Sequence, residues 1–119
     1  MYSERLMELF HNRTHAGRLE GATHLGEAGT PGQGPYTRLW LRVQDGEIEA
    51  AGYQTYGCPA IIGCMEALCR TLQGRALEET RGLVTAEQVV QWVGGLPDEK
   101  AHCPDLATRA WASCCAVGQ

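Results

Sequence analysis

The sequence predicts an α+β fold, in which a small antiparallel sheet of about three strands packs against a layer of α-helices. Three observations support this prediction. A helical pattern comes first, before any strand. An alternating segment follows and turns back on itself at Asp45-Gly46, a dipeptide typical of hairpin turns. The rest of the chain carries only helical patterns, so no parallel crossover between strands is expected.

Size and composition limit the function. The 119 residues fit a single domain over 1–119. A formal net charge of -4 gives no electrostatic basis for binding nucleic acid or an anionic membrane. No apolar run approaches the ~20 residues of a membrane span. The N-terminal segment has charges inside its apolar run, unlike a signal peptide. We therefore expect a cytoplasmic protein that binds neither nucleic acid nor membranes.

The first element is a helix from Ser3 to about Arg13. Ser3 is a typical N-cap, and an apolar face follows it (Leu6, Met7, Leu9, Phe10). A glycine-rich loop is then expected over 14–35. Loops of this length in compact domains are usually functional or disordered.

The hairpin consists of strands over 36–43 and about 47–56. In the first strand one face is apolar (Leu39, Leu41, Val43), and the other combines arginine and tryptophan (Arg38, Trp40, Arg42). The return strand has Ile48 as its clearest inward residue. Gly52 inside this strand is typical of a bulge.

Three helices complete the chain. The first runs from Pro59, a residue suited to the first helical position, to about Gln73, with Gly74 ending it. The second begins at Thr85, which forms a capping box with Gln88, and ends at the glycine pair 94–95. Pro104 opens the last helix.

Two Cys-Pro junctions stand out. Cys58 and Cys103 each precede a helix that starts with proline, and a helix N-terminus favours the thiolate that binds metals. His102 adds an imidazole beside the second thiol. Two sulfurs and one nitrogen suit zinc or iron–sulfur chemistry. The spacing fits two N-capping cysteines as well, and the pattern alone leaves both interpretations open.

The remaining cysteines and histidines give no comparable indication of a metal site. The chain has six cysteines, which should be free thiols in a reducing compartment. Those within helical patterns are interpreted as small buried apolar residues (Cys64, Cys69, Cys114, with Cys115 beside the last). The other histidines are assigned surface or structural roles (His11, His15, His24). Cys103 with His102 lacks a third orienting residue, so we do not expect an enzyme.

Three segments, in order, resemble the iron–sulfur cluster scaffold family of the NifU N-terminal domain and IscU type. The segment "YSERLMELFHNRTHAG" is similar to the family's N-terminal helix and the turn after it. The segment "RLWLRVQDGEIEAAGYQTYGCPA" resembles the hairpin that leads into the family's Thr-Phe/Tyr-Gly-Cys motif. The segment "LPDEKAHC" resembles the stretch that brings lysine, histidine and cysteine together before the last helix.

The resemblance implies a particular chemistry. Members of the family receive sulfur from a cysteine desulfurase, assemble a [2Fe–2S] cluster on three cysteines and pass it to apo iron–sulfur proteins. Some bind Zn²⁺ at the same site. Cys58 fits the second family cysteine and Cys103 the third, while His102 and Lys100 fit the neighbouring histidine and lysine.

This sequence lacks the first cysteine of the family pattern. Gln33 stands at its position, and Pro35 stands at the position of a family aspartate. An amide is a poor ligand for iron or zinc compared with a thiolate. Cys64 is not expected to replace the missing thiol, because position i+6 from Cys58 points away on a helix.

Three functions follow from the resemblance. A divergent scaffold would bind iron or a [2Fe–2S] cluster through Cys58, His102 and Cys103, with Gln33 and Lys100 lining the site. A non-catalytic module would hold Zn²⁺ on the same residues. A paralogue without scaffold activity would regulate the desulfurase. In each case we expect a monomer or a weak homodimer.

Overall fold

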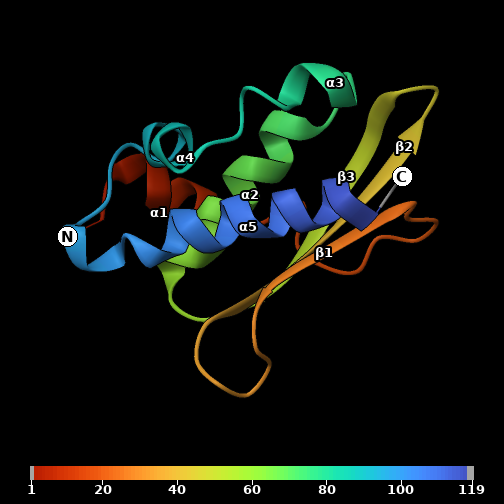
Figure 1. Ribbon diagram of the computed structural model, residues 1–119. Helices are drawn as coiled ribbons and strands as arrows, with labels where there is room; N and C mark the ends of the chain where they lie inside the picture. The colour runs from red at the N-terminus through yellow and green to blue at the C-terminus, as the bar shows by residue number, and fades with distance from the viewer. Residues whose placement is uncertain (1, 118–119) are drawn as a thin grey trace.

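The computed structural model describes residues 2–117 and confirms the predicted α+β fold (Figure 1). A three-stranded antiparallel sheet has the order β1-β2-β3. The helices, with one short 3-10 helix, precede and follow it. The elements in chain order are α1 (Glu4–His11), β1 (His24–Gly29), β2 (Tyr36–Gln44), β3 (Glu47–Tyr56), α2 (Pro59–Leu72), α3 (Leu77–Thr80), α4 (Ala86–Trp92), η1 (Asp98–Lys100) and α5 (His102–Val117).

The β2–β3 hairpin forms as predicted, with one correction. Asp45 and Gly46 both have positive φ (53° and 80°), as a tight primed hairpin turn requires. The predicted bulge at Gly52 is wrong, because the register shifts between Arg42 and Val43 instead. Gly52 has another role: a Cβ there would lie 2.9 Å from the carbonyl oxygen of Gly17. The glycine therefore lets the segment after α1 cross the sheet closely.

The expected loop over 14–35 is also wrong, because it contains strand β1. This strand pairs with β2 over its whole length, from His24 opposite Leu41 to Gly29 opposite Tyr36. Its buried and exposed residues alternate, but glycines disguise the pattern. A Cβ at Gly26 would collide with the Ala110 carbonyl and with the backbone of α5 one turn later. Close packing of α5 on β1 therefore requires glycine at position 26, and this glycine obscures the strand pattern in the sequence.

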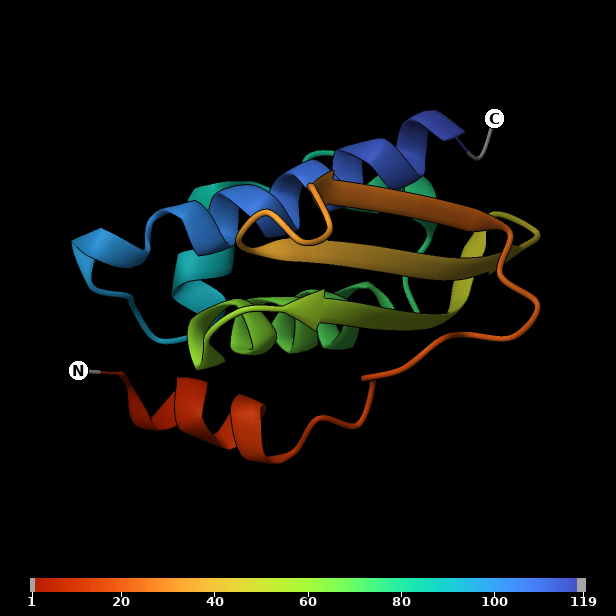
Figure 2. The ribbon, with the colours of Figure 1, turned by 90° about the horizontal axis from the view of Figure 1, so that it is seen from below.

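Both edge strands of the sheet make hydrogen bonds to other parts of the chain. At the β1 edge, the backbone amide of Glu27 donates to the hydroxyl of Ser113 on α5 at 3.2 Å. At the β3 edge, the amide of Gly17 donates to the Tyr53 carbonyl at 2.7 Å, and the Tyr53 amide donates to the His15 carbonyl at 3.2 Å. Figure 2 shows α5 running along β1, and the chain after α1 approaching the sheet at the opposite side.

The core lies between the sheet and helices α2 and α5. It combines the inward residues of the hairpin with the apolar faces of both helices (Leu39, Leu41, Ile48, Ile61, Met65, Leu68, Leu72, Ala107, Ala110, Trp111). The predicted burial of Cys64, Cys69 and Cys114 is confirmed. Five of the thiols are free (Cys58, Cys64, Cys69, Cys103, Cys114).

Caps fix most helix starts where the sequence predicts them. Ser3 accepts from the Leu6 amide at 2.9 Å, and Thr85 accepts from the Gln88 amide at 3.1 Å. Helix α5 starts at His102, earlier than the prediction at Pro104. A proline is tolerated in the first turn, where its missing N–H would be unpaired. Cys103 therefore lies inside the first turn of α5, whereas Cys58 is the N-cap of α2.

A buried carboxylate, Glu66, ties α2 to the N-terminal segment. It is 0% exposed and accepts hydrogen bonds from several groups: Thr14 Oγ1 (3.0 Å), His15 N and Nδ1 (3.1 and 2.8 Å), Tyr53 Oη (3.1 Å) and Arg70 Nε (2.9 Å). Arg70 also donates to the Asn12 carbonyl at 2.6 Å. His15 thus has the structural role expected of it. A buried charge with this many partners is fully compensated.

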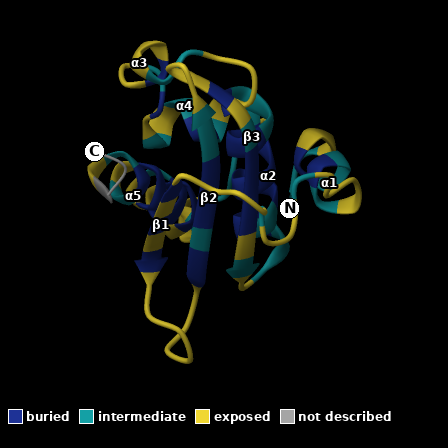
Figure 3. Ribbon diagram, turned by 90° about the vertical axis from the view of Figure 1, so that its right-hand side faces the viewer, coloured by how far each residue is buried: buried dark blue, intermediate teal, exposed yellow. Residues whose placement is uncertain are grey.

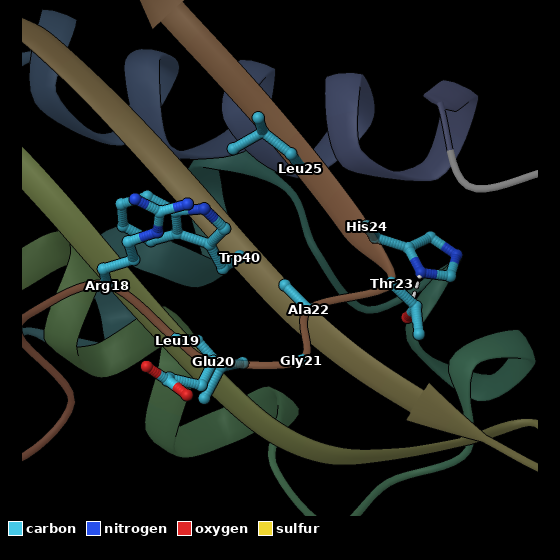
Figure 4. A pocket seen from close by; sticks show the side chains of 9 residues that line it. All are labelled: Arg18, Leu19, Glu20, Gly21, Ala22, Thr23, His24, Leu25 and Trp40. Atoms are coloured by element: carbon cyan, nitrogen blue, oxygen red, sulfur yellow. Dashed lines mark hydrogen bonds between the residues drawn. The ribbon is translucent and has the colours of Figure 1, made fainter.

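The outer face of the sheet carries a groove of about 550 Å³ between the segment 18–23 and strands β1 and β2. Figure 4 shows Arg18, Leu25 and Trp40 among the residues that line it. The Arg38 guanidinium lies over the Trp40 ring, 5.9 Å from its centre. This covering explains why Trp40 is only 7% exposed although it points away from the helices. None of the site residues predicted from the sequence lines this groove.

Among the residues described, no helix is long and apolar enough to span a bilayer.

Candidate metal centre

The two Cys-Pro junctions meet at one end of the molecule, where the first turns of α2 and α5 come together (Figure 1). The thiols of Cys58 and Cys103 hydrogen-bond to each other. They differ in access, because Cys58 is half-buried while Cys103 is 0% exposed. Residues far apart in the sequence therefore supply two sulfur donors to one place.

The environment of Cys58 favours its thiolate. Burial raises the pKa of Cys58, but the backbone amides of Ile61 and Ala60 at the start of α2 lower it. The ammonium of Lys100 lies 3.5 Å from the sulfur and lowers it further, as does the Cys103 thiol. The net pKa of Cys58 lies below its usual value. Cys58 thus has the properties of a metal-binding or nucleophilic cysteine.

Cys103 has the opposite environment. Burial, and then the neighbouring Cys58 charge, raise the pKa of Cys103 to about 12. His102, next to it in the chain, is exposed, and its Nε2 lies 3.5 Å from the Cys103 sulfur. The pKa is therefore lowered for one sulfur of the pair and raised for the other. A bound cation would favour deprotonation of the second sulfur.

Tyr2 is a neighbour of this site that the sequence did not single out. Burial raises the pKa of Tyr2, and the charge of Cys58 and a hydrogen bond to its sulfur raise it further. Lys100 acts on Tyr2 in the opposite direction. The phenol, the ammonium and the thiol therefore form one cluster. Tyr2 lies just before Ser3, the N-cap of α1, and no local sequence pattern links it to a cysteine so far along the chain.

The predicted ligands are brought together only in part. Among residues 2–117, no three His, Cys, Asp or Glu side chains converge as a ligand set for a metal ion. The contacts instead form a chain, from Lys100 to Cys58, from Cys58 to Cys103 and from Cys103 to His102. Thiolate and imidazole donors suit a soft metal. Among the described residues, however, the two cysteine sulfurs are the donors that contact each other.

Gln33 lies in the loop between β1 and β2, at the end of the sheet where β3 leads into Cys58. Figure 3 shows this loop extending beyond the sheet, and Gln33 is one of its exposed residues. Its backbone amide donates to the Thr30 carbonyl at 3.0 Å. At the base of the loop, Pro35 approaches Gly57, because Tyr36 pairs with Tyr56. The end of the loop thus lies beside Gly57, the residue before Cys58.

Cys64 lies closer to the pair than the sequence predicts. Burial raises its pKa well above the usual value, and the charges of Cys103 and then Cys58 raise it further. Its side chain is 0% exposed, so it is a buried neighbour of the two sulfurs. Counting positions along α2 could not show this, because Cys103 comes from a different helix.

Comparison with known proteins identifies the family. The family model "NifU-like N terminal domain" matches residues 1–117. The chain belongs to this family. Its members include scaffold proteins of iron–sulfur cluster assembly, and the matched range contains Cys58, Lys100, His102 and Cys103.

Two curated relatives are similar to this chain in sequence. The chain is 34% identical over 110 residues to the iron–sulfur cluster assembly scaffold protein IscU 1 of Archaeoglobus fulgidus, covering 92% of this chain and 71% of that protein. It is 36% identical over 105 residues to the nitrogen fixation protein NifU of Azotobacter chroococcum, covering 86% of this chain and only 33% of the relative. The scaffold domain thus corresponds to about a third of that longer protein.

Solved structures show the same fold. A NifU-like N-terminal protein from Brucella abortus superposes with a TM-score of 0.74 at 16% identity, covering 96% of this chain and 91% of that one. A SUF-system protein from Fervidobacterium islandicum superposes with a TM-score of 0.78 at 15% identity, covering 99% and 96%. At these identities the likeness establishes the architecture alone.

Proposed function

We propose that this chain carries iron or a [2Fe–2S] cluster as cargo on Cys58 and Cys103, with His102 as the adjacent third donor. The observation that supports this most is the meeting of two thiols from two helix starts, in a chain of the scaffold family. Thiolates are the preferred ligands of iron–sulfur clusters. The amides at the start of α2 and the Lys100 ammonium lower the pKa of Cys58, which favours the thiolate that would bind the cargo.

The incomplete ligand set has a consequence for this proposal. Because Gln33 replaces a thiol in the loop beside Cys58, the cargo must complete its coordination with water, a partner protein or a second copy of the chain. A cluster held in this way is expected to be labile. Under this proposal the chain is a cytoplasmic carrier and not an enzyme. A cysteine desulfurase supplies the sulfur, and apo iron–sulfur proteins receive the cluster.

Anaerobic reconstitution tests the proposal. The full chain is incubated with ferrous iron, cysteine and a cysteine desulfurase, and cluster formation is followed by absorption and circular dichroism in the visible range. We expect a cluster signal that Cys58→Ser or Cys103→Ser abolishes. Cys69→Ser is the matched control, because Cys69 is a buried thiol on α2 away from the pair. An unchanged signal in both site variants would contradict the assignment.

Gln33→Cys tests whether the loop still serves the site. If the loop reaches the two sulfurs, the added thiol should prolong cluster retention after gel filtration several-fold. No gain would show that the loop no longer takes part. Cluster binding by the natural chain would then depend on donors from outside it.

A desulfurase-regulating role, without cluster assembly, is the second candidate. Gln33 in place of a thiol favours it, as does the absence of three converging ligands among the described residues. A binding assay with purified desulfurase separates the two. Desulfurase binding without any cluster signal would support the regulator.

The zinc-binding alternative predicts one tightly held Zn²⁺ per chain and a lower melting temperature after chelation.

A further inference from the structure

The two sulfurs of the site are in contact and are unequally accessible. Cys58 is half-buried at the surface, and Cys103 is fully buried against it. Both are free thiols that hydrogen-bond to each other. A small oxidant can therefore reach the first sulfur from solvent, and the second is positioned to react with whatever forms there.

We propose that the site is also a thiol–disulfide switch, in which a hydroperoxide joins Cys58 to Cys103. The Cys58 sulfur attacks one peroxide oxygen, an S–O bond forms as the O–O bond breaks, and the second oxygen leaves as water with the thiol proton. The Cys103 sulfur then attacks the Cys58 sulfur. An S–S bond forms, the S–O bond breaks, and a second water leaves with the Cys103 proton. Two thiols lose two electrons, and one hydrogen peroxide accepts them.

Geometry selects this pair among the available thiols. A disulfide brings two sulfurs to about 2 Å, so only cysteines already in contact are within reach without backbone movement. Cys64 lies near the same pair but is 0% exposed, so it cannot be the sulfur that meets the oxidant first. Cys69 and Cys114 are buried elsewhere in the core. Fast condensation with Cys103 also protects Cys58 from irreversible oxidation.

The switch would close the cargo site. A disulfide sulfur is not a thiolate ligand, so the oxidised chain loses both sulfur donors at once, and a dithiol restores them. This consequence, unlike the disulfide itself, rests on the proposed function. Cargo loading would then occur only under reducing conditions.

Peptide mapping tests the disulfide directly. The full chain is reduced, freed of metal with a chelator and of reductant by gel filtration, and treated with one equivalent of hydrogen peroxide. Remaining thiols are blocked with N-ethylmaleimide, and the chain is digested without reduction. We expect the number of free thiols to fall from six to four. A cross-linked peptide pair containing Cys58 and Cys103 should appear within one chain and disappear with dithiothreitol.

Variants make the result specific. Cys64→Ala removes the neighbouring buried thiol and should leave the cross-link intact, whereas Cys103→Ser should convert Cys58 to higher oxidation states. A cross-link through Cys64, a cross-link between two chains, or a wild-type Cys58 that oxidises without any cross-link would overturn the proposal. The wild-type map does not depend on how the variants fold.

A metal-binding arm separates this proposal from the previous one. Zn²⁺ binding is compared for the reduced and oxidised chains, and oxidation should weaken it at least tenfold. If the reduced chain binds neither Zn²⁺ nor iron but still forms the cross-link, the cargo proposal fails and the switch stands. Equal Zn²⁺ binding by both forms would overturn the inferred closure of the site.

Discussion

Replacing Glu66 by glutamine removes the buried charge that holds the N-terminal segment on α2. The carboxylate is 0% exposed, and its donors include the Arg70 guanidinium at 2.9 Å and the backbone amide of His15 at 3.1 Å. Glutamine keeps the shape but presents an NH₂ group where an oxygen accepted hydrogen bonds, so donors face a donor. Breaking a buried ion pair from one side typically costs about 3 to 5 kcal/mol.

We expect the lower end of that range, about 3 kcal/mol, for Glu66→Gln, because Arg70 remains partly exposed and keeps its contact with Glu8. For a chain of this size the melting temperature should fall by roughly 10 °C. Urea unfolding of the reduced, metal-free chain, followed by far-ultraviolet circular dichroism, measures the loss. Glu78→Gln is the matched control. Its side chain is 83% exposed, and its ion pair with Arg81 should contribute less than about 1 kcal/mol.

The same pair of proteins gives a pH test. Burial raises the pKa of Glu66, but hydrogen bonds from His15 and Arg70 outweigh it, and the net pKa lies below its usual 4.5. A carboxyl whose pKa is lowered by folding stabilises the fold above its unfolded pKa, and that contribution is lost as the pH falls through its folded pKa. The stability gap between wild type and Glu66→Gln should thus be constant near neutral pH and narrow below pH 4.5. A loss under 1 kcal/mol at pH 7, or a gap that widens in acid, would refute the reasoning.

Three further predictions concern the helix contacts and the site. Gly26→Ala should cost about 3 kcal/mol in urea unfolding, because the new methyl group meets the backbone of α5, and a loss below 1 kcal/mol would contradict the packing. Ser3→Ala should cost about 1 kcal/mol in the same assay through loss of the α1 cap, while an unchanged midpoint would show the cap to be dispensable. Lys100→Met should shift the pH profile of iodoacetamide labelling at Cys58 to higher pH, because the ammonium that lowers the pKa of that thiol is gone; an unmoved profile would exclude this role.

The sequence predicts well those elements whose determinants are local. The hairpin follows from strand alternation around Asp45-Gly46, and the start of α2 follows from Pro59 behind Cys58. Strand β1 escapes prediction because Gly26, the residue that lets α5 approach, is atypical of strands. The packing of α5, which comes from the far end of the chain, thus determines which residue strand β1 has at position 26.

The candidate site follows the same rule. Cys58, Lys100, His102 and Cys103 are visible in the sequence through helix starts and family motifs, and the structure joins them pairwise. The place of Tyr2 depends on how α1 docks, which the sequence pattern does not encode. Glu66 was also missed as a buried charge, because its donors lie as far as 52 residues away in the chain.

The hydrogen bonds at both edges of the sheet restrict how two copies of this chain can associate. Cross-β fibrils grow when an edge strand offers a row of unpaired amides and carbonyls to another chain. Within residues 2–117, the Ser113 hydroxyl meets the outer side of β1, and the backbone of 15–17 occupies the outer side of β3. A second copy that paired with these backbone groups would have to displace Ser113 of α5 or the segment 15–17. We therefore expect copies of the folded chain to associate through side-chain surfaces, and not by extending the sheet.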